Sequence, residues 1–105
     1  MTLTAVESLT AYTSGETNIH TATADEQLIV TLVNESGGAG TITGLSKSTT
    51  TATQNAGGNL VPTGEPIADK QTITITGVVM TTAFEFLVLN ASVALTARVE
   101  GWKDV

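Results

Sequence analysis

Apolar and polar residues alternate along the last part of the chain. Val93, Leu95, Ala97 and Val99 occupy every second position of the segment 92–100. A period of two places successive side chains on opposite faces of a β-strand, so this segment is predicted to be a strand with one buried face. An apolar run at 84–89 precedes it, and a short break at 90–91 separates the two. We therefore interpret residues 84–102 as a β-hairpin.

Other segments show the same alternation or a short apolar run between turn residues. We predict strands at 8–12, 19–24 (an edge strand), 27–34 (a central strand), 41–46 and 71–76. A glycine cluster separates 27–34 from 41–46, which predicts a second hairpin. In 71–76, threonines alternate with Ile73 and Ile75, which are expected to face inward. Residues 77–80 either extend this strand or turn the corner.

The segment 47–66 is polar and rich in small residues. Its apolar anchors are Leu60 and Val61, and Pro62 and Pro66 are expected to interrupt regular structure. Connections of this length without structure of their own are uncommon in compact domains. We therefore predict a crossover that carries one short strand near residues 59–61.

These patterns together predict an all-β fold. Six to eight short strands with frequent turn signals, and no helical pattern, favour a single-domain antiparallel β-sandwich over residues 1–105, of the jelly-roll or immunoglobulin-like type. A barrel is the alternative. The 21 threonines among 105 residues support β structure, because β-branched side chains suit pleated strands. Residues 1–6 are expected to form an extended N-terminus.

The charge balance argues against several partners. Four basic residues stand against ten acidic ones, for a net charge of -6, and the basic residues are scattered along the chain. Direct nucleic-acid binding is therefore not expected, because it needs clustered cations. No apolar segment approaches the roughly 20 residues of a membrane-spanning helix, so we expect no membrane partner. The chain has no cysteine for a disulfide or a thiolate zinc site.

The sequence offers little catalytic chemistry. His20 is the only histidine and is expected to be a solvated strand residue, while the adjacent Asp25 and Glu26 would point to opposite sides of a strand. We predict no catalytic residue, no cofactor and no metal site, and no enzyme activity. Trp102, the only tryptophan, allows two interpretations: it caps the core, or it anchors an interface.

Three stretches carry a resemblance to a known class of proteins. They are residues 8–15, the strand 28–34 with its ending Val33-Asn34-Glu35-Ser36, and the final run 93–102, which ends in Glu100-Gly101-Trp102. Together with the crossover and the Thr/Ile strand, they resemble small tailed-bacteriophage virion proteins. These are similar to capsid cement (decoration) proteins and to small tail-associated or fibre-associated β-sandwiches. The hydroxyl-rich middle of this chain departs from that pattern.

The resemblance implies a non-enzymatic structural protein of the virion. Its expected place is the capsid surface, after synthesis in the host cytoplasm, where it would bind the major capsid protein and stabilise contacts between neighbouring copies. It would also form a homo-oligomer, a dimer or a trimer. The segments expected to touch partners are the termini 1–6 and 102–105 and the crossover. The expected interface residues are Thr2, Leu3, Thr4, Leu60, Val61 and Trp102.

Two alternatives stay open. The first is a tail, adaptor or fibre-associated component of the virion. The second is a carbohydrate-binding β-sandwich module, which usually displays several exposed aromatic side chains. The four aromatic residues of this chain are Tyr12, Phe84, Phe86 and Trp102, and most of them look like core residues.

Overall fold

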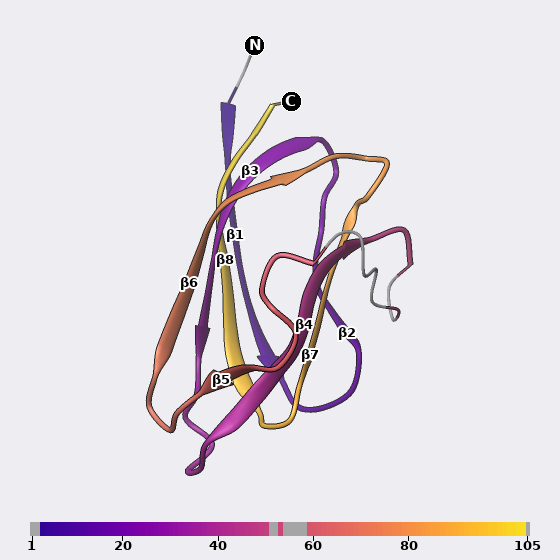
Figure 1. Ribbon diagram of the computed structural model, residues 1–105. Coiled ribbons are helices and arrows are strands. Elements are labelled where there is room, and N and C mark those ends of the chain that lie inside the picture. The colour runs from indigo at the N-terminus through magenta and orange to yellow at the C-terminus, as the bar shows by residue number, and fades with distance from the viewer. Residues whose placement is uncertain (1–2, 51–52, 54–58, 105) are drawn as a thin grey trace.

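The protein is an antiparallel β-sandwich (Figure 1). The structure is a computed structural model that describes residues 3–50, 53 and 59–104, and within these ranges there is no helix. The strands are β1 (Leu3–Tyr12), β2 (Thr17–Thr21), β3 (Asp25–Val33), β4 (Gly40–Ser48), β5 (Glu65–Ile67), β6 (Thr72–Met80), β7 (Phe86–Ala91) and β8 (Leu95–Asp104). The predicted all-β, single-domain sandwich is confirmed.

The strands form two four-stranded sheets with a jelly-roll topology. The first sheet has the order β1-β8-β3-β6 and the second the order β2-β7-β4-β5. The pairs β1 with β8, β2 with β7, β3 with β6 and β4 with β5 are all antiparallel and are nested from the ends of the chain inward. This nesting is the jelly-roll arrangement, and it differs from the strand order of immunoglobulin domains. Both ends of the described chain lie at one end of the sandwich (Figure 1).

The core lies between the sheets and follows the predicted alternation. Leu95, Ala97 and Val99 of β8 are buried, as the period of two predicted. In β6, Ile73 and Ile75 pack against the core. The pairing of β6 with β3 then shifts near Gly77, whose φ is +68°, and this bulge changes the phase of the strand. Beyond it, Val78 and Met80 face inward, so residues 77–80 extend the strand.

The predicted terminal hairpin is wrong. β7 pairs with β2 and β4, whereas β8 pairs with β1 and β3, so the two strands lie in opposite sheets. The link between them crosses the end of the sandwich, where Val93 lies against Gly40; a Cβ at Gly40 would come within 2.6 Å of Val93. Apolar periodicity identifies the buried face of each strand. It does not say whether two consecutive strands share a sheet.

The predicted hairpin of β3 with β4 is also wrong, because these strands too lie in opposite sheets. Asn34 is fully buried and lies directly after β3, where the chain leaves the first sheet for the second. Its amide nitrogen donates to the carbonyls of Gly38 at 2.9 Å and Ala68 at 3.1 Å, and its oxygen accepts from the N–H of Ser36 at 3.0 Å. The glycine loop is therefore tied to the segment after β5.

The crossover is partly as predicted. Asn59 makes an isolated bridge with Ser46, but the strand of this segment is β5, further along the chain. Pro66 lies inside β5, which is an edge strand that tolerates a missing N–H. At the start of the chain, residues 3–6 form the first part of β1 and pair with β8.

Candidate binding surface

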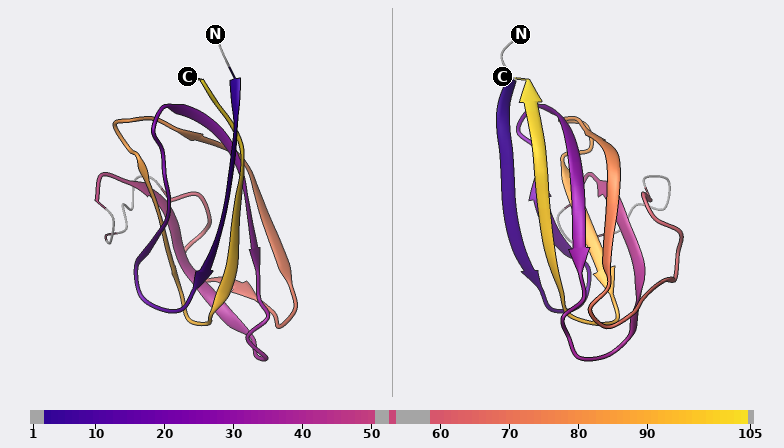
Figure 2. Two further views of the ribbon diagram at one scale, coloured as in Figure 1. Left: turned by 180° about the vertical axis from the view of Figure 1, so that it is seen from behind. Right: turned by 90° about the vertical axis from the view of Figure 1, so that its left-hand side faces the viewer.

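Large apolar side chains gather on one outer face of the sandwich. Six such residues are exposed in the described part of the chain, and five of them project from the first sheet away from the core. The five are Leu3, Leu9, Ile29, Val79 and Trp102. The right view of Figure 2 faces this sheet. Soluble monomers rarely leave contiguous apolar surface exposed without a use for it, so this face is the candidate binding surface.

The register of the sheet places Trp102 in a row of residues that crosses this face near the end of β8. Trp102 lies between Ala5 of β1 and Gln27 of β3, and Gln27 is in turn opposite Val79 of β6. Side chains of directly paired residues are about 5 Å apart at their Cβ atoms. One continuous row therefore crosses all four strands, with the indole, which is 56% exposed, near its centre.

Gly101 lets β8 approach β3 closely beside the indole. A Cβ at this position would lie 2.0 Å from the carbonyl oxygen of Gln27. Any side chain at Gly101 would push the two strands apart. The glycine of the ending Glu100-Gly101-Trp102 is thus required by the close approach of β8 to β3.

Two shallow hollows adjoin the indole. One, of about 530 Å³, is lined by Ala5, Ile29 and Trp102 among others. The other, of about 430 Å³, is lined by Leu3, Val79 and Trp102 among others. We call the five residues Leu3, Ala5, Ile29, Val79 and Trp102 the Trp102 patch. Its relief can accept side chains of a partner on both sides of the indole.

Carboxylates border the Trp102 patch in two like-charged pairs. Glu7 of β1 is directly opposite Glu100 of β8, and both line the first hollow. Asp25 of β3 is directly opposite Asp104 of β8, and both line the second. All four side chains are exposed. The patch is therefore apolar at its centre and acidic at both ends.

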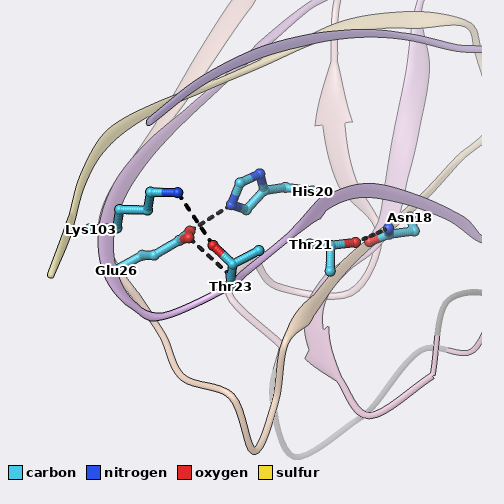
Figure 3. A network of polar contacts seen from close by, with 6 residues as sticks. All are labelled: Asn18, His20, Thr21, Thr23, Glu26 and Lys103. Atoms are coloured by element: carbon cyan, nitrogen blue, oxygen red, sulfur yellow. Dashed lines mark hydrogen bonds and ion pairs between the residues drawn. The ribbon is translucent and has the colours of Figure 1, made fainter. Parts of the chain in front are cut away.

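A buried polar pair lies beneath this end of the first sheet (Figure 3). The Nε2 atom of His20 and the Oε1 atom of Glu26 are 2.6 Å apart, and the two side chains are 10% and 2% exposed. The backbone N–H of Thr23 donates to Oε2 of Glu26 at 3.3 Å, and Nζ of Lys103 donates to the hydroxyl of Thr23 at 3.4 Å. The pair joins β2 of one sheet to β3 of the other.

The expectation of a solvated His20 is therefore wrong. The pairing of β2 with β7 shifts between Asn18 and His20, and this bulge allows Ile19 and His20 both to face inward. The expectation for Asp25 and Glu26 is confirmed, because the first is exposed and the second is buried.

The residues predicted to form an interface lie in different environments. Leu3, Thr4 and Trp102 are exposed at the shared end of β1 and β8. The interpretation of Trp102 as a cap of the core is wrong for this reason. Leu60 packs against the core and Val61 is 8% exposed, so the crossover presents little of either residue. Thr2 lies outside the described residues.

The sequence pattern does not predict that Ile29, Val79 and the carboxylate pairs belong to this surface. A signal for the first two exists, since β3 and the end of β6 are apolar at consecutive positions, and not only at alternate ones. In 27–34 this pattern predicts a central strand, but it also marks a strand with two apolar faces. The carboxylate pairs left no signal, because residues 7 and 100 become neighbours only through the strand register.

Among the residues that the structure describes, no group of three or more potential metal ligands comes together. Nor does any described segment form a helix long and apolar enough to cross a membrane. A scan against protein-family models and searches of curated proteins and of solved structures found no match to this chain. The exposed surface is therefore the feature from which a function can be inferred.

Proposed function

We propose that this chain is a non-enzymatic structural protein of a tailed-bacteriophage virion. In this proposal it is a capsid cement, or decoration, protein that binds the outer capsid surface and stabilises contacts between major capsid proteins. It is made in the host cytoplasm and acts on the virion. The observation that carries the proposal is the Trp102 patch, an exposed apolar surface on one face of an otherwise compact sandwich.

The shape and chemistry of the patch suit lattice binding. A sheet face with one exposed indole makes a modest contact, and such contacts become effective when many copies bind a repeating surface. Jelly-roll sandwiches occur among viral capsid proteins and lectins. Because one fold serves many functions, the topology supports the proposal only in combination with the exposed face. Self-association as a dimer or trimer stays a prediction.

A carbohydrate-binding module is the second candidate. It is favoured by the exposure of Trp102 between two hollows that contain carboxylates and Gln27. An indole face stacks on the apolar face of a sugar ring, and the polar groups could accept its hydroxyl hydrogens. The expectation that most of the aromatic residues belong to the core is wrong, because Phe84 is 42% exposed, Phe86 is half-buried and only Tyr12, at 1% exposure, is fully buried. Phe84 lines neither hollow, so it adds no second stacking surface beside the indole.

Capsid binding tests the proposal directly. Purified protein is added to capsids of the encoding phage that were produced without it, and occupancy is measured by cryo-electron microscopy and by sedimentation. We expect saturable, symmetric occupancy of the capsid surface. Labelling of tails only would support the tail or fibre alternative, and binding to a glycan array without capsid binding would support the carbohydrate module; either result would contradict the cement function.

Matched variants identify the surface used. Trp102→Ser should weaken capsid binding at least tenfold, because interface tryptophans commonly contribute about 2 kcal/mol or more. Leu9→Ser is the control, since Leu9 is exposed on the same sheet face but lines neither hollow that adjoins Trp102. Equal losses from the two variants would mean that the Trp102 patch is not the contact.

A further inference from the structure

We propose that the Trp102 patch recognises a basic protein surface, in which an apolar side chain is flanked on both sides by lysine or arginine. The inference depends on the proposed function and specifies the chemistry of the capsid surface that would be bound. The occupant is thus a positively charged partner. A second copy of this chain does not fit.

The spacing of the carboxylates sets the spacing of the partner's cations. Glu100 and Asp104 each lie two residues from Trp102 along β8, on opposite sides of it. A strand rises about 3.3 Å per residue, so each carboxylate pair is about 7 Å from the indole along the strand and the two pairs are about 13 Å apart. A complementary surface would present two cationic groups at that separation with an apolar group between them.

No described residue of the chain neutralises these carboxylates. Among the described residues, no ion pair within 4.0 Å involves Glu7, Asp25, Glu100 or Asp104. Lys103 is directed to the hydroxyl of Thr23, and Lys47 donates to the carbonyl of Val79. Arg98 is exposed on the outer face of the first sheet, without an ion pair to Glu100. The acidic border is therefore left open to a partner.

The pairing of like charges across the sheet also supports a positively charged partner. Like charges directly opposite one another in a sheet destabilise it, and here the arrangement occurs twice around one apolar patch. A cationic partner would remove this repulsion on binding and would be steered to the patch by it. If two copies packed through this patch, the four carboxylates of one copy would face the four carboxylates of the other copy and repel them.

Selection from a random peptide display library tests the chemistry without assuming a partner. The target is the folded wild-type protein, and the Trp102→Ser variant serves as the counter-target that removes binders of other surfaces. We expect enriched peptides that carry one basic residue on each side of an apolar residue. Their affinity should fall about tenfold or more for the double variant Glu100→Gln and Asp104→Asn, and also on raising the salt concentration.

A second double variant controls for net charge. Glu16→Gln with Glu35→Gln removes two exposed carboxylates from the loops at the opposite end of the sandwich, and should leave peptide affinity unchanged. Enrichment of neutral or acidic peptides, no enrichment over the counter-target, or equal effects of the two double variants would overturn the inference. So would self-association in sedimentation experiments that Trp102→Ser abolishes, because the occupant would then be a second copy.

The two proposals can fail separately. If capsid binding depends on Trp102 but is insensitive to salt and to the Glu100 and Asp104 substitutions, the cement function stands and the basic partner is wrong. If basic peptides bind at the patch and capsids are not labelled, the recognition chemistry stands and the cement function is wrong.

Discussion

The two sheets differ in how far apolar side chains on their outer faces are exposed to solvent. On the second sheet, Val88 is 0% exposed although it points away from the core, since its neighbours Leu87 and Leu89 point into it. On the first sheet, Val79 also points away from the core, between Val78 and Met80, and is 47% exposed. The same residue type in the same kind of position is thus covered on one face and open on the other.

On the second sheet, the outward apolar side chain is buried by the fold itself. On the first sheet, the corresponding side chain is exposed and would be buried only by a partner. Ser46 and Ser48 accompany Val88 on the covered face, with 0% and 3% exposure. The fold therefore excludes water from this part of the outer face of the second sheet, whereas Thr41 and Thr43 of β4 are exposed. The first sheet has no such cover over Trp102, and the apolar area there is available for binding.

The sharpest test places a charge at the two matched valines. Val88→Asp should lower the free energy of unfolding by about 4 kcal/mol or prevent folding, because an unpaired charge would be buried. Val79→Asp should cost about 1 kcal/mol or less, because its carboxylate remains in water. Urea denaturation followed by circular dichroism measures both. Similar costs for the two would mean that the outer faces do not differ as described.

A second test compares two carboxylates of the first sheet: Glu26 on the inner face, which is tested through its partner His20, and Glu7 on the outer face. His20→Ala should lower the free energy of unfolding by about 3 kcal/mol, because it leaves the buried Glu26 without its ring partner. Glu7→Gln, on the outer face, should leave stability unchanged or slightly increase it, since it removes a like-charged neighbour of Glu100. Thermal and urea unfolding provide the measurement. A negligible effect of His20→Ala would show that the pair does not hold the sheets together.

The smallest expected effect concerns the acidic border alone. Glu7→Lys converts the pair with Glu100 from like to opposite charge and should stabilise the fold by about half a kcal/mol or less, because both side chains are exposed and screened. The gain should vanish at high salt. The double variant Glu7→Lys with Glu100→Lys restores repulsion and is the control. A loss of stability in the single variant would contradict the assumed cross-strand contact.

The candidate surface could be predicted only in part. Trp102 and the N-terminal residues Leu3 and Thr4 were identified from sequence as possible contacts, because they lie at chain ends with few charges. Val61 was proposed on the same grounds and is buried, since the segment after Asn59 runs along β4. Whether an apolar residue in a crossover faces solvent depends on the strand beside it, and that strand is distant in sequence.

The amino-acid sequence by itself determined most of the strands and their buried faces, but not β5, which lies further along the chain than the strand expected near 59–61. The alternation in 93–99 and around Ile73 and Ile75 is local, and it persists whatever the strands pair with. Only the tertiary structure decided the pairing, because backbone hydrogen bonds are nearly independent of side-chain identity. Pairing in turn placed His20 against Glu26, left Trp102 in the open and brought like charges together across β8. These features follow from register between distant segments, which no local pattern encodes.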